Sequence, residues 1–133
     1  MNSKRKKSGI IIIGDEILSG RTKDTNSNFI ITNLSTRGVD VEEVSIIKDE
    51  EFEIIKKVKE FSSKFDFVFT TGGIGPTHDD ITALSISKAF NLSYEINITA
   101  KKQLKKHYNK PGELTEARLK MAYMPKGANL INN

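Results

Sequence analysis

A short glycine-rich loop, placed directly after an apolar segment, constrains the fold of this chain more than any other feature. A mostly apolar segment, residues 65–69, leads into Gly72, Gly73 and Gly75, and a helix-like pattern over residues 81–90 follows. The glycines therefore lie at a junction between a strand and a helix. In α/β proteins such junctions bind anions and carry catalytic residues.

Strand patterns recur three times before residue 72. Four consecutive isoleucines, Ile10–Ile13, predict a central strand over residues 9–14 that helices bury on both faces. Residues 39–47 predict a second strand nearer the sheet edge, and residues 65–71 predict a third. Alternation of strands with helices predicts an α/β fold in three layers, with helices on both faces of a mostly parallel sheet.

Helices are predicted to follow these strands, over residues 24–34, 49–61 and 81–90. Asp79 or Asp80 is the predicted N-terminal cap of the third helix. Beyond it, residues 92–96 predict a short extended segment, and residues 97–108 and 115–122 have helical patterns.

Size and composition fit one domain. A chain of 133 residues with 37% hydrophobic content is long enough for a single core. Its longest uninterrupted apolar run, Ile10–Ile13, is far shorter than the ~20 residues that a membrane helix needs. The absence of cysteine rules out a disulfide framework. We therefore expect a cytoplasmic protein that does not act at a membrane.

The net positive charge comes from the start of the chain. Residues 4–7 supply four of the 21 basic residues, and the other 17 equal the 17 acidic residues in number. We therefore predict a disordered basic leader over residues 1–7 and a domain of balanced charge over residues 8–133. A balanced domain gives no reason to expect a nucleic-acid partner.

Two acidic pairs are predicted to share one crevice with the glycine loop. Asp15 and Glu16 follow the first strand, and parallel strands end at the same edge of a sheet. The glycines suit a phosphate, but Asp79 and Asp80 would repel it unless a cation lay between them. We therefore predict Mg²⁺ or another divalent metal, held by Asp80 with Asp15 or Glu16. The alternatives are a tight turn without a ligand and helix-capping roles for the aspartates.

Three segments carry a resemblance to a known family. They are Gly14-Asp15-Glu16-Ile17-Leu18-Ser19-Gly20, then Asp24-Thr25-Asn26, then Thr71-Gly72-Gly73-Ile74-Gly75-Pro76-Thr77 with Asp79-Asp80-Ile81-Thr82. Together they resemble the molybdopterin-binding (MoaB/Mog) domain, and most closely the N-terminal domain of the competence-damage inducible protein CinA. The family domain continues past the position of Asn133, so we expect this chain to lack the family's C-terminal segment.

The resemblance implies a three-layer α/β domain whose crevice binds the phosphate of molybdopterin or of an adenine nucleotide. It implies catalytic and metal-binding roles for Asp80 and Asp15. It also implies that the ligand is contacted by Gly14, Glu16, Asp24, Asn26, Thr71, Gly72, Gly73, Gly75, Pro76, Thr77 and Thr82. Relatives assemble as homodimers or homotrimers, and either assembly is the corresponding expectation here.

Three functions are consistent with these residues and with the resemblance. CinA-like members imply metal-dependent hydrolysis of ADP-ribose-type pyrophosphates, and this is the leading hypothesis. The molybdenum-cofactor members imply a biosynthetic enzyme that adenylates molybdopterin. The third alternative is a non-catalytic module for binding or oligomerisation.

Overall fold

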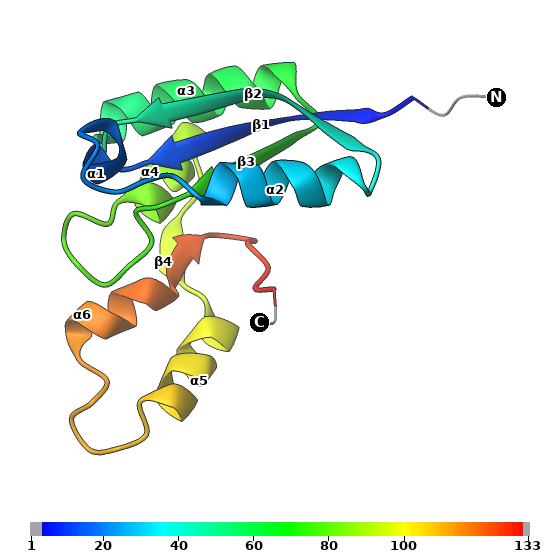
Figure 1. Ribbon diagram of the computed structural model, residues 1–133. Coiled ribbons are helices and arrows are strands. Elements are labelled where there is room, and N and C mark those ends of the chain that lie inside the picture. Colours follow the sequence, from blue (N-terminus) through cyan, green and yellow to red (C-terminus); the bar gives the residue numbers. More distant parts are fainter. Residues whose placement is uncertain (1–3, 132–133) are drawn as a thin grey trace.

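A parallel sheet of three strands forms the centre of the protein. The computed structural model describes residues 4–131. Strand β1 (Lys6–Ile13) lies between β2 (Val39–Ile47) and β3 (Phe67–Thr71), and both pairings are parallel. Ile10–Ile13 are at most 3% exposed, because helices cover the sheet on both faces (Figure 1). The predicted central strand, edge strand and parallel order are confirmed.

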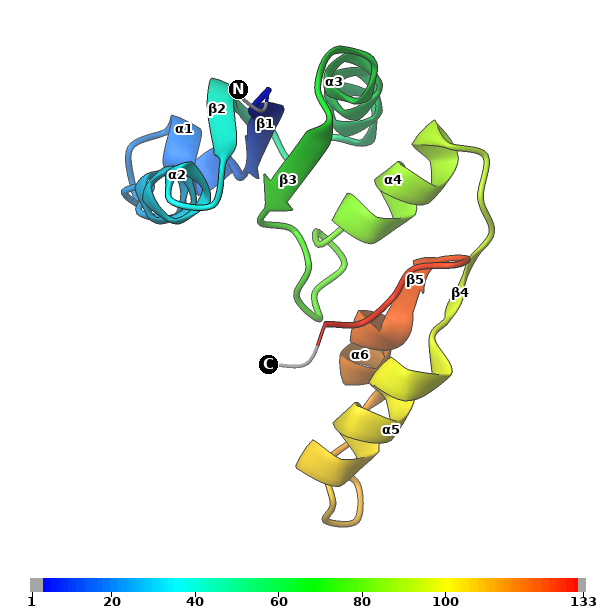
Figure 2. The same ribbon diagram turned by 90° about the vertical axis from the view of Figure 1, so that its right-hand side faces the viewer.

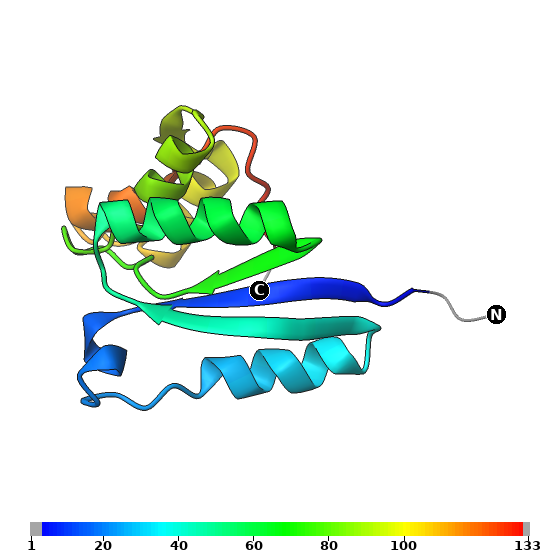
Figure 3. The same ribbon diagram turned by 90° about the horizontal axis from the view of Figure 1, so that it is seen from above.

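Helices on opposite sides of this sheet complete the three predicted layers. Helix α2 (Asn26–Ser35) lies on one side, and α3 (Glu51–Lys64) and α4 (Thr82–Ala89) lie on the other (Figure 2). The short helix α1 (Asp15–Leu18) leaves the end of β1 on the α2 side (Figure 3). No helix within residues 4–131 is long and apolar enough to cross a membrane.

Helix α3 supplies most of the apolar packing on its side of the sheet. Its inward face carries Ile54, Val58 and Phe61, all at most 4% exposed. Burying a phenylalanine of this kind contributes about 1.5–3 kcal/mol. Phe61 rests on Gly9 of β1, where an added β-carbon would lie 2.5 Å from the ring. The predicted helix over residues 49–61 is confirmed, and its buried residues recur at the helical spacing of three to four residues.

The predicted starts of two strands are wrong. Strand β1 begins at Lys6, three residues before the predicted start at residue 9, so Lys6 and Lys7 of the predicted leader belong to the sheet. The main-chain carbonyl of Lys7 accepts a hydrogen bond from the N–H of Asp66, which ties this end of β1 to β3. Residues 1–3 of the predicted leader lie outside the described residues. Helix α3 ends at Lys64 with Phe65 as its C-cap, and β3 begins at Phe67 rather than at residue 65.

A second, smaller unit follows α4. It contains β4 (Tyr94–Ile96), α5 (Ile98–His107), α6 (Glu116–Leu119), the 3₁₀ helix η1 (Lys120–Ala122) and β5 (Tyr123–Pro125). Strands β4 and β5 pair antiparallel in a sheet of their own. The extended segment at residues 92–96 is confirmed in part, but its partner strand at residues 123–125 was not predicted. The smaller unit lies below α4 in Figure 1.

Candidate functional site

A polar cavity of about 400 Å³ lies where the parallel strands end. We term it the acidic cavity, and it is lined by Asp15, Glu16, Arg21, Asp49, Gly73, Thr77, Asp79 and Asp80. Strands β1, β2 and β3 run in one direction, so the residues that follow them meet at one edge. The structure thus brings together the acidic pair after β1 and the glycine loop after β3, as the sequence predicted.

The glycine loop has a conformation that other residues would disturb. Gly72 has φ +94°, and an added β-carbon would lie 2.0 Å from the carbonyl oxygen of Ile13. Gly73 has φ +68°, and its β-carbon would lie 2.2 Å from the hydroxyl oxygen of Thr82. Real β-carbons do not approach backbone so closely, and positive φ itself favours glycine. The glycines therefore allow the loop to pack directly on the end of β1.

Thr82 holds the glycine loop in place through two hydrogen bonds. Its side chain is 1% exposed, and its hydroxyl donates a hydrogen bond to the carbonyl oxygen of Gly72 at 2.8 Å. Its main-chain N–H donates to the carbonyl oxygen of Gly73 at 3.1 Å. Thr82 does not line the acidic cavity, and in this arrangement its hydroxyl holds the loop.

Asp80 turns back toward the loop instead of capping the next helix. Its Oδ2 accepts hydrogen bonds from the N–H of Thr77 at 2.9 Å and from the Thr77 hydroxyl at 2.8 Å. Helix α4 begins after Ile81 without a side-chain cap, so the prediction that Asp79 or Asp80 caps it is wrong. The Thr77 donors lie close in sequence and compete successfully for the carboxylate.

These hydrogen bonds keep Asp80 ionised. Partial burial alone would raise the pKa of Asp80, but the donors of Thr77, the N–H of Gly75 and the charge of Lys120 together lower it below its ordinary value. Some of the loop's N–H groups are thus already directed at an internal carboxylate. A phosphate in the acidic cavity needs positive charge beyond what those loop amides supply.

Asp49 is a cavity residue that the sequence reasoning missed. Its Oδ1 is buried and has no hydrogen-bond partner among the described residues. Its main-chain N–H donates to Oδ1 of Asp15 at 3.2 Å. Burial and the neighbouring charges of Asp15, Asp80, Glu16 and Asp79, in that order, raise its pKa. The signal was present, because Asp49 follows β2 and β2 ends at the same edge.

Lys120 is a second missed residue, and no sequence signal pointed to it. Its side-chain ammonium donates a hydrogen bond to the carbonyl oxygen of Thr77. Lys120 comes from η1 in the smaller unit, so this contact joins that unit to the glycine loop.

Asp24 and Asn26 lie away from the acidic cavity, at the start of α2. The carboxylate of Asp24 accepts hydrogen bonds from the N–H groups of Asn26 and Ser27, at 3.0 Å and 3.2 Å, and from the Ser27 hydroxyl. The Ser27 hydroxyl is the main reason that the pKa of Asp24 is lowered. These contacts organise the first turn of α2. The remaining predicted residues flank the cavity in the chain without lining it, namely Gly14, Thr71, Gly72, Gly75 and Pro76.

The donor set determines what kind of metal site fits here. Across residues 4–131, no three histidine, aspartate or glutamate side chains are placed to hold a metal ion by themselves. Magnesium in nucleotide sites uses one or two carboxylates, water and substrate phosphates. The unpartnered Oδ1 of Asp49 and the other carboxylates of the acidic cavity fit that shared arrangement. They do not fit a cage made of protein ligands alone.

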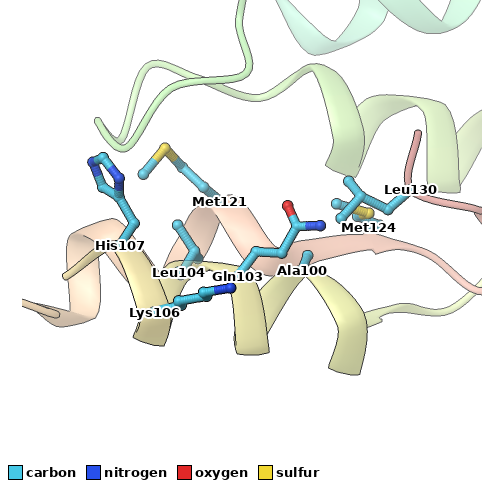
Figure 4. A pocket seen from close by; sticks show the side chains of 8 residues that line it. All are labelled: Ala100, Gln103, Leu104, Lys106, His107, Met121, Met124 and Leu130. Carbon is cyan, nitrogen blue, oxygen red and sulfur yellow. The ribbon is translucent and has the colours of Figure 1, made fainter. Parts of the chain in front are cut away.

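A larger cavity, of about 680 Å³, lies in the smaller unit and shares no lining residue with the acidic cavity. It is lined by Ala100, Gln103, Leu104, Lys106, His107, Met121, Met124 and Leu130 (Figure 4). None of these residues is a carboxylate, and none belongs to the sequence motifs described above. Volume alone therefore does not identify the functional site, whereas the convergence of loops and charges does.

Comparison with known proteins identifies the family. Residues 9–129 match the family model described as "Probable molybdopterin binding domain". A protein of Caldivirga maquilingensis is 44% identical over 125 residues, which are 93% of this chain and 49% of that protein. The chain thus spans about half the length of this curated relative.

Two solved structures share the fold. The protein CinA of Thermoplasma acidophilum, described as of unknown function, is 35% identical with a TM-score of 0.89, over 98% of this chain and 77% of that one. The tungsten cofactor synthesizing protein MoaB of Pyrococcus furiosus is 29% identical with a TM-score of 0.60, over 84% and 68% of the two chains. The predicted α/β fold and its likeness to CinA and MoaB are thereby confirmed, and the chain belongs to the molybdopterin-binding domain family.

Proposed function

We propose that the acidic cavity binds the phosphates of a nucleotide or pterin together with a divalent metal ion, and that it hydrolyses ADP-ribose-type pyrophosphates. The observation that carries this proposal is the buried Oδ1 of Asp49, which has no hydrogen-bond partner among the described residues. A buried carboxylate oxygen is costly unless a cation or donor completes it. A metal ion shared with a phosphate would do so.

One group of residues would bind the metal ion, and another would orient the phosphates. Asp80 and Asp15, with Asp49 beside Asp15, would hold the metal, which would neutralise and polarise the pyrophosphate. Arg21 and the backbone at Gly73 line the same cavity and would orient the phosphates. Hydrolysis breaks one P–O bond of the pyrophosphate, adds water across it and yields AMP and ribose 5-phosphate.

The test is turnover of ADP-ribose by the purified protein with and without magnesium, manganese or cobalt, with AMP release as the readout. Asp80→Asn and Asp15→Asn are each expected to lower the rate at least 100-fold, because loss of a metal-binding carboxylate removes transition-state charge stabilisation worth several kcal/mol. Glu95→Gln is the control, since Glu95 is exposed on β4 and lies outside the acidic cavity. Full metal-dependent activity in Asp80→Asn would remove Asp80 from the mechanism.

Adenylation of molybdopterin is the second candidate. It is supported by the description of the matching family and by the likeness to MoaB of Pyrococcus furiosus. The same protein incubated with molybdopterin, ATP and magnesium would then form adenylated pterin and release pyrophosphate. Ligand binding without either reaction would instead identify a non-catalytic binding module.

A further inference from the structure

A second cavity adjoins the acidic cavity, with Asp80 in the lining of both. It has a volume of about 390 Å³ and a mostly apolar wall. Ile81, which precedes α4, and Leu84 of α4 form one part of the wall, and Tyr94 of β4 and Tyr123 of β5 form another. We term it the aromatic cavity. The end of the glycine loop, α4, β4, η1 and β5 thus build a hollow beside the candidate phosphate site.

The two tyrosines form a single aromatic surface. Their ring centroids lie 5.3 Å apart with an angle of 35° between the ring planes. Tyr94 pairs with Pro125 and Tyr123 with Ile96, so the tyrosines are diagonal neighbours on one face of the ladder. Met124, between them in register, lines the larger cavity on the opposite face (Figure 4). Because successive side chains of β5 point to opposite faces, Tyr123 lines the aromatic cavity and Met124 lines the larger cavity.

Polar groups lie at the rim that faces the acidic cavity. His78, Asp80 and Lys120 belong to the lining of the aromatic cavity, and Lys120 is bound to the carbonyl of Thr77. Burial of Tyr94 is the main reason that its pKa is raised, so its hydroxyl remains a hydrogen-bond donor at neutral pH. An apolar hollow with a few polar groups at one end is the usual form of a small-molecule subsite.

We propose that the aromatic cavity binds the planar heterocyclic ring of the ligand whose phosphates occupy the acidic cavity. This inference rests on the proposed function. Because Asp80 lines both cavities, the two lie next to each other. A purine or pterin with a phosphate ester combines a flat apolar face with a charged end. Tyrosine rings stack on such faces whichever ring is present. Lys120 and His78 offer hydrogen bonds to the edge of the ring.

Calorimetric titrations in magnesium test this assignment with four probes. AMP and neopterin monophosphate are the two ringed probes that carry a phosphate, ribose 5-phosphate has the phosphate without the ring, and adenosine has a ring without the phosphate. Stacking of one base is worth roughly 1–3 kcal/mol, so at least one ringed probe is expected to bind about 10-fold or more tightly than ribose 5-phosphate. The tighter of the two identifies the ring.

Variants at the two tyrosines separate stacking from folding. Tyr94→Leu and Tyr123→Leu keep an apolar side chain and are expected to abolish the advantage of the ringed probe, while ribose 5-phosphate binds as before. Tyr94→Phe and Tyr123→Phe keep the ring and are expected to retain the advantage. Met124→Leu is the matched control on the opposite face of the same ladder.

Each contrary result has a distinct meaning. If ribose 5-phosphate binds the wild type as tightly as both ringed probes, the aromatic cavity is not the ring site and the proposed phosphate site stands. If adenosine binds in a tyrosine-dependent way but ribose 5-phosphate does not bind, the phosphate proposal fails and the ring site stands. Absence of binding by any probe overturns both. Sedimentation that becomes monomeric in Tyr94→Leu would mean that a second copy of the chain covers this cavity, which also overturns the assignment.

Discussion

The side chain of Lys120 is hydrogen-bonded to the main-chain carbonyl oxygen of Thr77, although 43 residues separate them. Lys120 comes from the smaller unit and Thr77 from the glycine loop. The contact also brings a positive charge close enough to lower the pKa of Asp80. Lys120 therefore connects the smaller unit to the glycine loop and also lowers the pKa of Asp80 in the candidate site.

Lys120→Met should loosen this link while it preserves the apolar stem of the side chain. Loss of one hydrogen bond from a charged donor costs about 1.5–3 kcal/mol, so amide hydrogen exchange over residues 77–80 should become faster. Lys126→Met serves as the control, since Lys126 is exposed and lines none of the cavities described above. Equal exchange rates in the two variants would show that the loop is held by its own hydrogen bonds.

Thr77→Val should destabilise the protein in a pH-dependent way. The pKa of Asp80 is lowered in the fold, so its contribution to stability is present above the ordinary value of 3.8 and is lost as the pH falls through the lowered pKa. Removing the Thr77 hydroxyl should cost about 1.5–3 kcal/mol at pH 7, the range for a hydrogen bond to a charged group. Urea denaturation of both proteins at pH 7 and near pH 2.5 should show a smaller difference at the lower pH. A difference that does not change with pH would mean that the hydroxyl acts by packing alone.

Gly73→Ala should destabilise more than Gly20→Ala. Both glycines have positive φ, at +68° and +80°, so both variants incur the left-handed strain of roughly 1–2 kcal/mol. At Gly20 an added β-carbon meets nothing within 4 Å, whereas at Gly73 it meets the Thr82 hydroxyl at 2.2 Å and Asp49 Oδ1 at 3.3 Å. Thermal and urea denaturation should show an additional loss of about 1–3 kcal/mol at Gly73, typical of overpacking. Equal losses would indicate that the loop relaxes to accept the methyl group.

Asp49→Asn should stabilise the ligand-free protein at neutral pH. Because the pKa of Asp49 is raised in the fold, its stabilising contribution is present below 3.8 and is lost as the pH rises through the raised pKa. Asparagine removes the ionisation, so the variant should gain about 0.5 kcal/mol at pH 7, a value discounted for the partial exposure of the group. The gain should vanish below pH 3.8.

The matched control for this change is Glu50→Gln, the exposed neighbour of Asp49. It should leave stability unchanged within error at both pH values. A loss of stability at pH 7 in Asp49→Asn would show that the carboxylate already has a favourable partner in the free protein. Metal-dependent activity should fall in Asp49→Asn even as stability rises, which is the usual exchange at functional sites.

Local sequence patterns were enough to predict the parallel sheet and the edge of that sheet at which the acidic cavity lies. The isoleucines of β1, the period of α3 and the glycines after β3 each encode structure within a few residues. Parallel order then follows from alternation of strands and helices, and it places Asp15 beside the glycine loop. The same rule places Asp49, which follows β2, at this edge, so its position was also predictable from the sequence.

The tertiary structure alone decided which partners those side chains take. Asp80 was equally suited to cap α4 or to bond Thr77, and packing of Gly75 against its carboxylate favoured the second. Lys120 reaches Thr77, and Tyr94 meets Tyr123, because β4 and β5 pair across a gap of 26 residues that contains α5, α6 and η1. The amino-acid sequence determines local conformation through periodicity and turn chemistry. Contacts between distant residues depend on how whole elements pack, and for that reason only the folded chain fixes them.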